Sequence, residues 1–262
     1  MKFIKKLMIT VALLLPSLVL MSCASSNDPA ETYRGETPKQ IFLKGEEALR
    51  DSNYSEAVKR FEALEVQYPL ESYTQTGQLH LIYAYYRSQD YASAEAAAER
   101  YIRAYPTSPH IDYAYYMYGL STYYHNLGVF ERIFSVDLAT RDTSQIKKSF
   151  EEFSTIVHRY PNSRYAPSAH QYMVYLRNVL ADHELQVAQY YYDRKAYVAA
   201  ASRANTVIQN YQGASAVPEA LVIMVKSYRA LGLMEPADQA YSVLEYNYPN
   251  STYVKQAVTA DS

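Results

Sequence analysis

Cysteine, tryptophan and glycine are scarce in this chain, whose 262 residues include one Cys, no Trp and 7 Gly. The single cysteine, Cys23, has no partner for an intramolecular disulfide and cannot form a thiolate cluster for zinc. The histidines include no pair with the spacing of a zinc-protease motif, and neither a Gly-rich phosphate loop nor a Gly-x-Ser-x-Gly elbow occurs. We therefore expect no metal site and no catalytic residue.

An excess of basic charge is also absent, because 25 Lys and Arg are set against 27 Asp and Glu. A near-neutral to mildly acidic balance argues against nucleic acid as a partner, since that usually requires a basic face. The abundant residue is tyrosine, with 30 copies. Tyrosine has a large apolar body and a polar tip, which suits both packing and peptide-binding surfaces.

The N-terminus has the zones of a secretory signal peptide over residues 1–22. Three lysines precede an apolar run over residues 7–20, which is too short for a transmembrane helix of about 20 apolar residues. The segment ends on Leu20-Met21-Ser22-Cys23, which resembles the lipoprotein box of bacteria. That resemblance implies cleavage before Cys23 and attachment of a diacylglycerol and an N-acyl chain to it. An ordinary secreted protein with an incidental cysteine is the alternative.

Removal of the signal peptide takes away three lysines and lowers the formal charge from −2 to about −5. Ala24 follows the cysteine where an Asp would, in many enteric bacteria, retain a lipoprotein at the inner membrane. By that resemblance we expect a lipid anchor in the periplasmic leaflet of the outer membrane. No other cofactor is expected. Residues 23–37 lack apolar periodicity and are interpreted as a flexible lipidated tether.

Residues 38–262 contain a repeated pattern with two parts. Each repeat ends at a tyrosine, four times followed by proline, which disfavours helical geometry in the residue before it. These tyrosines are Tyr68, Tyr105, Tyr160, Tyr211 and Tyr248. Eleven residues before each lies a small residue that permits close helix packing, namely Ala57, Ala94, Ser149, Ala200 and Ala237. A period of 37 residues, seen twice, resembles the tetratricopeptide class.

The fold prediction is therefore an all-α, right-handed superhelical solenoid of five tetratricopeptide-like helix-turn-helix repeats. Two intervals between successive repeat ends, from Tyr105 to Tyr160 and from Tyr160 to Tyr211, are longer than 37 residues. The first is interpreted as an insertion at about residues 128–143. The second is interpreted as a longer first helix of the fourth repeat, at about residues 165–194. A boundary between the second and third repeats would divide the solenoid into an N-terminal half (38–107) and a C-terminal half (108–262).

Candidate functional residues lie on binding surfaces, because the first helix of each repeat lines the concave face of such solenoids. Tyr68, Tyr73, Tyr83 and Tyr86 are candidates for holding an extended client peptide, and packing between repeats is the alternative for each. Glu71-Ser72 resembles the catalytic pair of some lytic transglycosylases. Structure explains this pair better, since serines follow other repeat ends as helix N-caps and acids favour a first helical turn.

Several stretches together resemble the BamD family of outer-membrane assembly lipoproteins. They are residues 81–86, 109–113, 119–120, 134–137, 141–142, 160–165, 187–192 and 197–200, with Arg203. This resemblance implies a scaffold that binds the POTRA domains of the β-barrel insertase, small accessory lipoproteins and unfolded outer-membrane clients. A tetratricopeptide lipoprotein that coordinates peptidoglycan synthesis is the alternative.

The BamD resemblance also assigns site residues by position. Arg203 is the first candidate for the insertase contact, because an arginine fork at the margin of a packed face can bind an acidic partner. Arg194 is the second. Arg141 and Asp142 are further candidates, although an internal pair that pins the insertion is the favoured interpretation for them.

Overall fold

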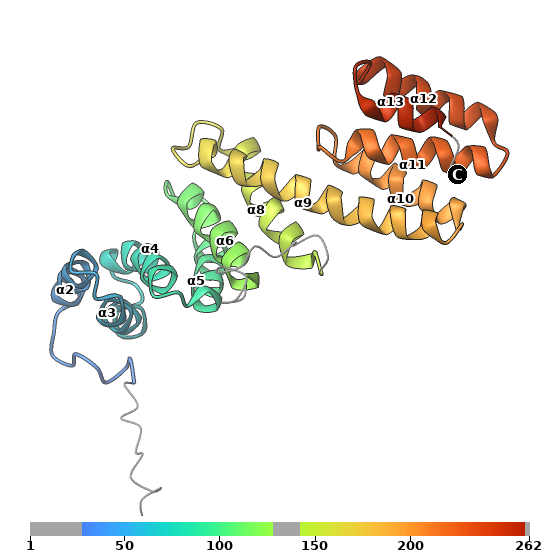
Figure 1. Cartoon of the computed structure of the whole chain (residues 1–262). Coiled ribbons are helices and arrows are strands. Elements are labelled where there is room, and N and C mark those ends of the chain that lie inside the picture. Colours follow the sequence, from blue (N-terminus) through green and yellow to red (C-terminus); the bar gives the residue numbers. More distant parts are fainter. Residues whose placement is uncertain (1–27, 128–141, 260–262) are drawn as a thin grey trace, which may run out of the picture. The chain divides into compact units, whose positions relative to one another are not determined.

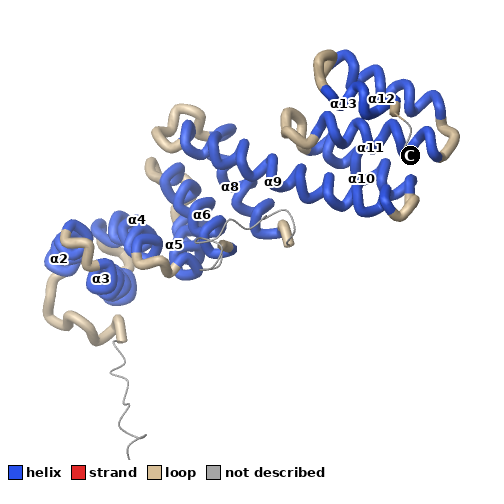
Figure 2. The backbone as a smooth tube through the Cα atoms, viewed as in Figure 1, coloured by secondary structure: helices blue, strands red, loops and turns tan. Residues whose placement is uncertain are grey.

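The computed structural model describes residues 28–127 and 142–259 and contains helices and turns but no strand within those ranges (Figures 1 and 2). In this part of the chain, five pairs of helices are followed by one short helix. They are α2 (Pro38–Arg50), α3 (Tyr54–Gln67), α4 (Ser72–Arg87), α5 (Tyr91–Ala104), α6 (Ile111–Asn126), α8 (Ser144–Arg159), α9 (Ala166–Asp193), α10 (Tyr197–Asn210), α11 (Val217–Ala230), α12 (Met234–Asn247) and α13 (Thr252–Val258). The predicted helix-turn-helix repeats are confirmed.

The second helix of each pair ends as the sequence predicts. The five repeat-ending tyrosines are the C-caps of α3, α5, α8, α10 and α12, and each backbone N–H donates to the carbonyl four residues earlier. Their φ angles cluster between −126° and −136°, outside the helical region. The proline after four of them enforces this extended conformation, because it excludes helical geometry from the residue before it.

The small residues of the repeat are the points of closest helix packing. All five are completely buried. Two glycines on the preceding helices complete these contacts: a Cβ on Gly45 would lie 2.7 Å from the Phe61 ring, and one on Gly119 would lie 2.9 Å from the Phe153 ring. The Ser149 hydroxyl also donates to the Gly119 carbonyl at 2.9 Å.

The fourth repeat has the lengthened first helix that its spacing predicts. α9 runs from residue 166 to 193, and Tyr165 and Arg194 are its N-cap and C-cap. The insertion predicted at 128–143 lies outside the described residues except for its last two, Asp142 and Thr143.

The chain divides into two compact units, residues 1–77 and 78–262, of which the first is described from residue 28. The division falls within α4 rather than near residue 107, where the two halves were expected to meet. The reason is that α5 packs against α6. Leu79, Ile82, Ala98 and Tyr101 consequently share one hydrophobic core with α6, α8 and the helices that follow.

The first unit has a small core of its own. Ile41, Phe42, Phe61 and Leu64 are buried between α2 and α3. The Phe42 ring also packs against Tyr73 at the start of α4, with ring centroids 5.3 Å apart. No helix among the described residues combines the length and the apolar character that crossing a membrane requires.

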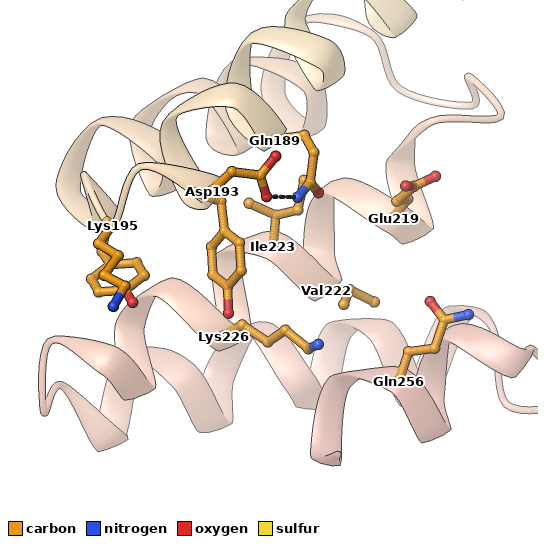
Figure 3. A pocket seen from close by; sticks show the side chains of 10 residues that line it. Gln189, Asp193, Lys195, Glu219, Val222, Ile223, Lys226 and Gln256 are labelled. Atoms are coloured by element: carbon orange, nitrogen blue, oxygen red, sulfur yellow. Dashed lines mark hydrogen bonds between the residues drawn. The ribbon is translucent and has the colours of Figure 1, made fainter. Parts of the chain in front are cut away.

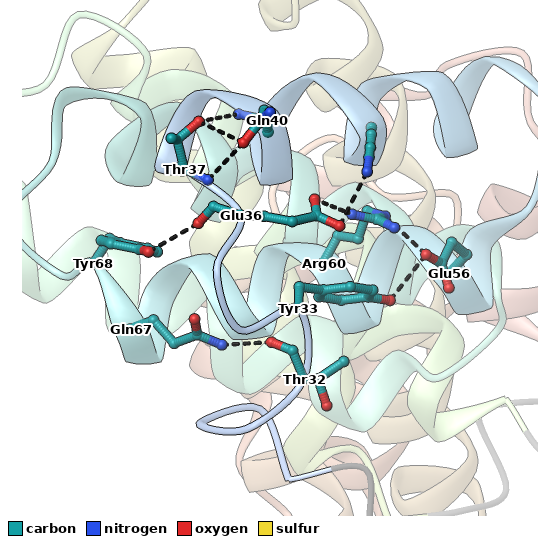
Figure 4. A network of polar contacts seen from close by, with 10 residues as sticks. Thr32, Tyr33, Glu36, Thr37, Gln40, Glu56, Arg60, Gln67 and Tyr68 are labelled. Carbon is teal, nitrogen blue, oxygen red and sulfur yellow. Dashed lines mark hydrogen bonds and ion pairs between the residues drawn. The ribbon is translucent and has the colours of Figure 1, made fainter.

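Residues 28–37, which were interpreted as the last part of a flexible tether, make defined contacts with the first repeat. They form a strap that lies along α3 (Figure 4). Near the end of α3, the Gln67 side chain donates to the carbonyls of Pro29 and Thr32, at 2.7 and 2.6 Å. The Tyr68 hydroxyl donates to the Glu36 carbonyl at 2.9 Å.

A second set of contacts fixes the middle of the strap through Arg60, whose side chain is 11% exposed. Its guanidinium stacks over the Tyr33 ring at 3.9 Å from the centroid and pairs with Glu56 and Glu36, at 2.8 and 3.1 Å. Burial and the hydrogen bond to Glu56 raise the pKa of Tyr33 to about 12. Burial opposes ionisation of Glu36, but its bonds to Lys44 and Arg60 lower its pKa overall. These contacts order the strap without any regular secondary structure.

Candidate interaction surfaces

Arg203 lies on α10, where its guanidinium donates to the carboxylate of Glu184 on α9 at 2.9 Å. The Arg203 side chain is 47% exposed and that of Glu184 is 9% exposed. A buried carboxylate requires a cation or several hydrogen bonds, so this pair contributes to the packing of α9 on α10. Arg203 is thus half-exposed beside the buried Ala204, and its role as a partner contact stays a prediction.

Sequence reasoning missed Glu184, although a signal for it exists. Residues 176, 180, 184 and 188 share one face of α9, and Leu176, Leu180 and Ala188 are buried there. An acid in this apolar stripe predicts a basic partner on the neighbouring helix. Arg203 is that partner.

Arg194 is the C-cap of α9 and is exposed. Its guanidinium lies over the Tyr190 ring at 3.7 Å from the centroid, and the Tyr190 residue is itself 51% exposed. Glu184 and Arg194 are separated by ten residues of α9, or about 15 Å along the helix axis. Arg194 and the Arg203–Glu184 pair therefore belong to the same helix hairpin.

Of the two insertion residues, Arg141 lies outside the described residues and Asp142 can be placed. The Asp142 carboxylate accepts hydrogen bonds from the backbone N–H and the hydroxyl of Ser144, both at 3.0 Å. These bonds lower the pKa of Asp142. Asp142 thus accepts the first backbone N–H of α8, whose N-cap is Thr143.

A cleft of about 430 Å³ opens at the α9–α10 turn, and no sequence motif indicated it (Figure 3). Val222 and Ile223 of α11 form an apolar part of its wall, and Gln256 of α13 and Gln189 of α9 contribute amides. The Gln189 amide donates to Asp193 at 2.6 Å. An apolar wall with a few polar groups at its rim is a common composition of ligand clefts. The cleft is completed by Tyr192, Lys195, Tyr197, Glu219 and Lys226.

The four client-binding candidates are all partly exposed, and all four also make internal contacts. Tyr68 bonds to the strap and Tyr73 packs on Phe42, as described above. Tyr83 accepts a hydrogen bond from Arg87. Tyr86 packs edge-on against Tyr91 and Tyr124, with centroids 5.5 and 5.9 Å away. Burial, and secondarily Tyr124, raise the pKa of Tyr86.

Much of the tyrosine content is explained by a network of aromatic rings in the second unit. Phe153 stacks on Tyr172 with centroids 4.9 Å apart, and Tyr116 stacks on Tyr165 at 5.0 Å. Burial raises the pKa of Tyr172 and of Tyr123, so both phenols stay neutral. Further members are Tyr86, Tyr91, Tyr113, Tyr124 and Tyr175.

Glu71 lies exposed in the turn before α4, where its carbonyl accepts the N–H of Thr74 at 2.9 Å. Ser72 is the first residue of α4 rather than a cap before it. Of the equivalent serines in later repeats, Ser251 is the N-cap of α13 and accepts from the N–H of Tyr253. Ser163 accepts from the N–H of Tyr165, which is itself the N-cap of α9. Within the described ranges, His, Cys, Asp and Glu form no group of three or more that is placed to hold a metal ion.

Comparison with known proteins now identifies the family. A family model described as outer membrane lipoprotein (YfiO) matches residues 34–244. The outer membrane protein assembly factor BamD of Neisseria meningitidis serogroup B is 35% identical over 98% of this chain and 96% of its own length. The chain belongs to the BamD family. Other BamD proteins are also similar: that of Pasteurella multocida is 34% identical over 89% of this chain and 88% of its own. The BamD of Vibrio cholerae is 32% identical over 91% of this chain and 98% of its own length.

The BamD family is thus one of outer membrane lipoproteins, in agreement with the destination expected from the N-terminus. Cys23 itself lies outside the described residues. Two solved structures of other proteins were also matched, each over 85% of this chain. One is a thermophilic TPR protein of Thermus thermophilus, at 12% identity, full coverage of that chain and a TM-score of 0.39. The other is the type IV pilus biogenesis factor PilW, at 13% identity, 98% coverage and a TM-score of 0.37.

Proposed function

We propose that this chain is a lipid-anchored scaffold subunit of the machine that folds β-barrel proteins into the outer membrane, and that it acts without covalent chemistry. The observation that carries the proposal is the 35% identity to an outer membrane protein assembly factor, which extends over nearly the full length of both chains. Acyl chains on Cys23 hold it in the periplasmic leaflet. Each buried methylene adds roughly 0.8 kcal/mol of membrane affinity, so three chains make a stable anchor.

Within this function, the α9–α10 hairpin docks on the POTRA domains of the insertase. The half-exposed Arg203 supports this assignment, because Glu184 holds its guanidinium in place before a partner arrives. Preorganisation reduces the entropy lost on binding, and a guanidinium forms strong charge-assisted bonds to carboxylates. Arg194 contributes a second, weaker contact.

Unfolded clients bind through aromatic contacts in both units. Tyr68 and Tyr73 serve in the first, Tyr83 and Tyr86 in the second, and each keeps part of its surface exposed beside its internal contacts. The cleft at the α9–α10 turn is suited to a segment of an accessory lipoprotein. Both assignments follow from surface chemistry that favours extended polypeptides.

Depletion of the protein tests the proposal against the peptidoglycan alternative. The chain is placed under a repressible promoter, and two quantities are followed as it disappears: the fraction of outer-membrane β-barrels that resist unfolding in cold detergent, and the incorporation of a fluorescent D-amino acid. The proposal predicts that folded barrels decline first. An early loss of incorporation with normal barrel folding contradicts it.

A further inference from the structure

The first repeat ends in an apolar turn that the other repeats do not share. Leu70 lies two residues after Tyr68 and is 98% exposed, and Val66 in the last turn of α3 is 53% exposed. The residues equivalent to Leu70 in the other four repeats are polar or glycine: Thr107, Asn162, Gly213 and Asn250. Packing within the unit does not account for Leu70, because its side chain is almost fully in solvent.

The strap brings the start of the folded chain to this same end of α3. Gln67 lies between Val66 and Leu70 in sequence and holds the carbonyls of Pro29 and Thr32. Six residues lead from Cys23 to Pro29 and can extend at most about 22 Å. Without the strap, fifteen residues would lead to Pro38, with a maximum reach of about 54 Å. An acyl group on Cys23 is therefore confined near the apolar turn.

We propose that Val66 and Leu70 form a membrane-contact tip, which enters the lipid surface beside the acyl anchor. The inference rests on the proposed acylation of Cys23. A short tether keeps the tip at an effective concentration on the order of millimolar at the surface, so even a weak apolar contact is populated. Burial of apolar side chains at the boundary of the acyl chains is favourable.

The charges around the tip define the kind of surface it fits. Asp28 and Glu31 in the strap and Glu71 beside Leu70 are acidic and exposed. Arg34 is the nearby base, and it pairs with Glu31 at 2.7 Å. Attraction to anionic headgroups therefore does not drive the contact. The tip enters a largely zwitterionic surface through its apolar side chains.

Depth-dependent fluorescence quenching in vesicles tests the contact. Because acylation consumes the only native thiol, a Glu71→Cys variant of the full acylated chain takes one environment-sensitive dye next to an intact Leu70. The protein is reconstituted in vesicles that consist mainly of zwitterionic phosphatidylethanolamine, with a minor fraction of phosphatidylglycerol and nitroxide-labelled lipid. The reference label is Asp51→Cys in the turn before α3, about 21 Å away along the helix. Quenching several-fold stronger at residue 71 than at residue 51 is expected.

Two further variants separate the tip from the dye and from the anchor. Leu70→Ser in the Glu71→Cys protein should reduce quenching several-fold, and Gln67→Ala should reduce it by lengthening the free tether. Equal quenching at residues 71 and 51, or no effect of Leu70→Ser, overturns the inference while leaving the anchor intact. A protein that fails to float with vesicles, and whose Cys23 is unmodified by mass spectrometry, overturns the anchor and the tip together.

Discussion

Glu152 on α8 shows how the environment of one residue sets a pH dependence. Burial raises its pKa to about 7, an effect that Lys148 partly offsets and that Glu151, Glu99 and Glu95 reinforce. Between the unfolded pKa of about 4.5 and the folded value, the native state retains a proton that the unfolded state has lost. The free energy of unfolding therefore falls as pH rises through this window, and the loss is complete above about pH 7.

Glu152→Gln should remove that dependence. We expect the variant to be more stable than the native chain at pH 8 by on the order of 1 kcal/mol, a figure reduced because the carboxylate is partly exposed. At pH 4 the two proteins should be equal. Urea unfolding followed by circular dichroism measures the difference. Asp238→Asn, which neutralises an exposed acid on α12, is the control. A native chain whose stability is flat between pH 4.5 and 7 would contradict the assignment.

Gly119 is a position where a larger side chain does not fit. A Cβ there would meet the Phe153 ring, which is held in place by its neighbours. Phe153 is stacked on Tyr172 with an interplanar angle of 11°. Gly119→Ala should lower the free energy of unfolding by about 1–3 kcal/mol through overpacking. In a Phe153→Leu background the same substitution should cost less, since the side chains in contact are coupled. Urea unfolding of the four proteins of this cycle gives the coupling energy, and an identical cost in both backgrounds would refute the contact.

Among the elements, the ends of the second helices and both bounds of α9 were predictable to within a residue, and the strap was not. The helices are encoded locally, by buried small residues at fixed spacing and by a terminal tyrosine before proline. The strap has no period, because individual contacts order it: Gln67 with two carbonyls, Arg60 with Tyr33 and Glu36. The Arg203–Glu184 pair was predicted only in part, because it too depends on an individual contact between helices. The exposed arginine was found, but its buried partner needed the packing of α9 on α10.

Gln67→Ala should release the strap. The carbonyls of Pro29 and Thr32 lose their shared donor, so amide exchange over residues 29–36 should accelerate about tenfold, equivalent to ~1.4 kcal/mol. Hydrogen exchange followed by mass spectrometry measures this, with α8 as the internal reference. Gln239→Ala on α12, an exposed glutamine, is the matched control and should leave the strap unchanged. Unaltered exchange over 29–36 in Gln67→Ala would show that other contacts hold the strap.

At the scale of the whole molecule, the two compact units are stabilised by different interactions. The second has a continuous core from α4 to α13, reinforced by stacked tyrosines, whereas the first depends on a small core and the strap. Composition and repeat spacing predicted an all-helical scaffold, and the BamD family assignment confirmed the resemblance. The division of the chain within α4 was not predictable, since it depends on which neighbouring helices share a core rather than on the repeat period.

The central claim, that the molecule is an assembly scaffold that docks through Arg203, is tested most directly by capture from membranes. The full chain, with a C-terminal tag, is isolated in mild detergent and its partners are identified by mass spectrometry. Arg203→Gln with Glu184→Gln removes both charges without leaving either one buried alone, whereas Glu184→Gln alone keeps the arginine. We predict recovery of a β-barrel protein with POTRA domains by the native chain, weaker recovery by Glu184→Gln, which keeps the arginine but not its orientation, and loss from the double variant. Recovery of cell-wall synthases without a barrel insertase would contradict the account.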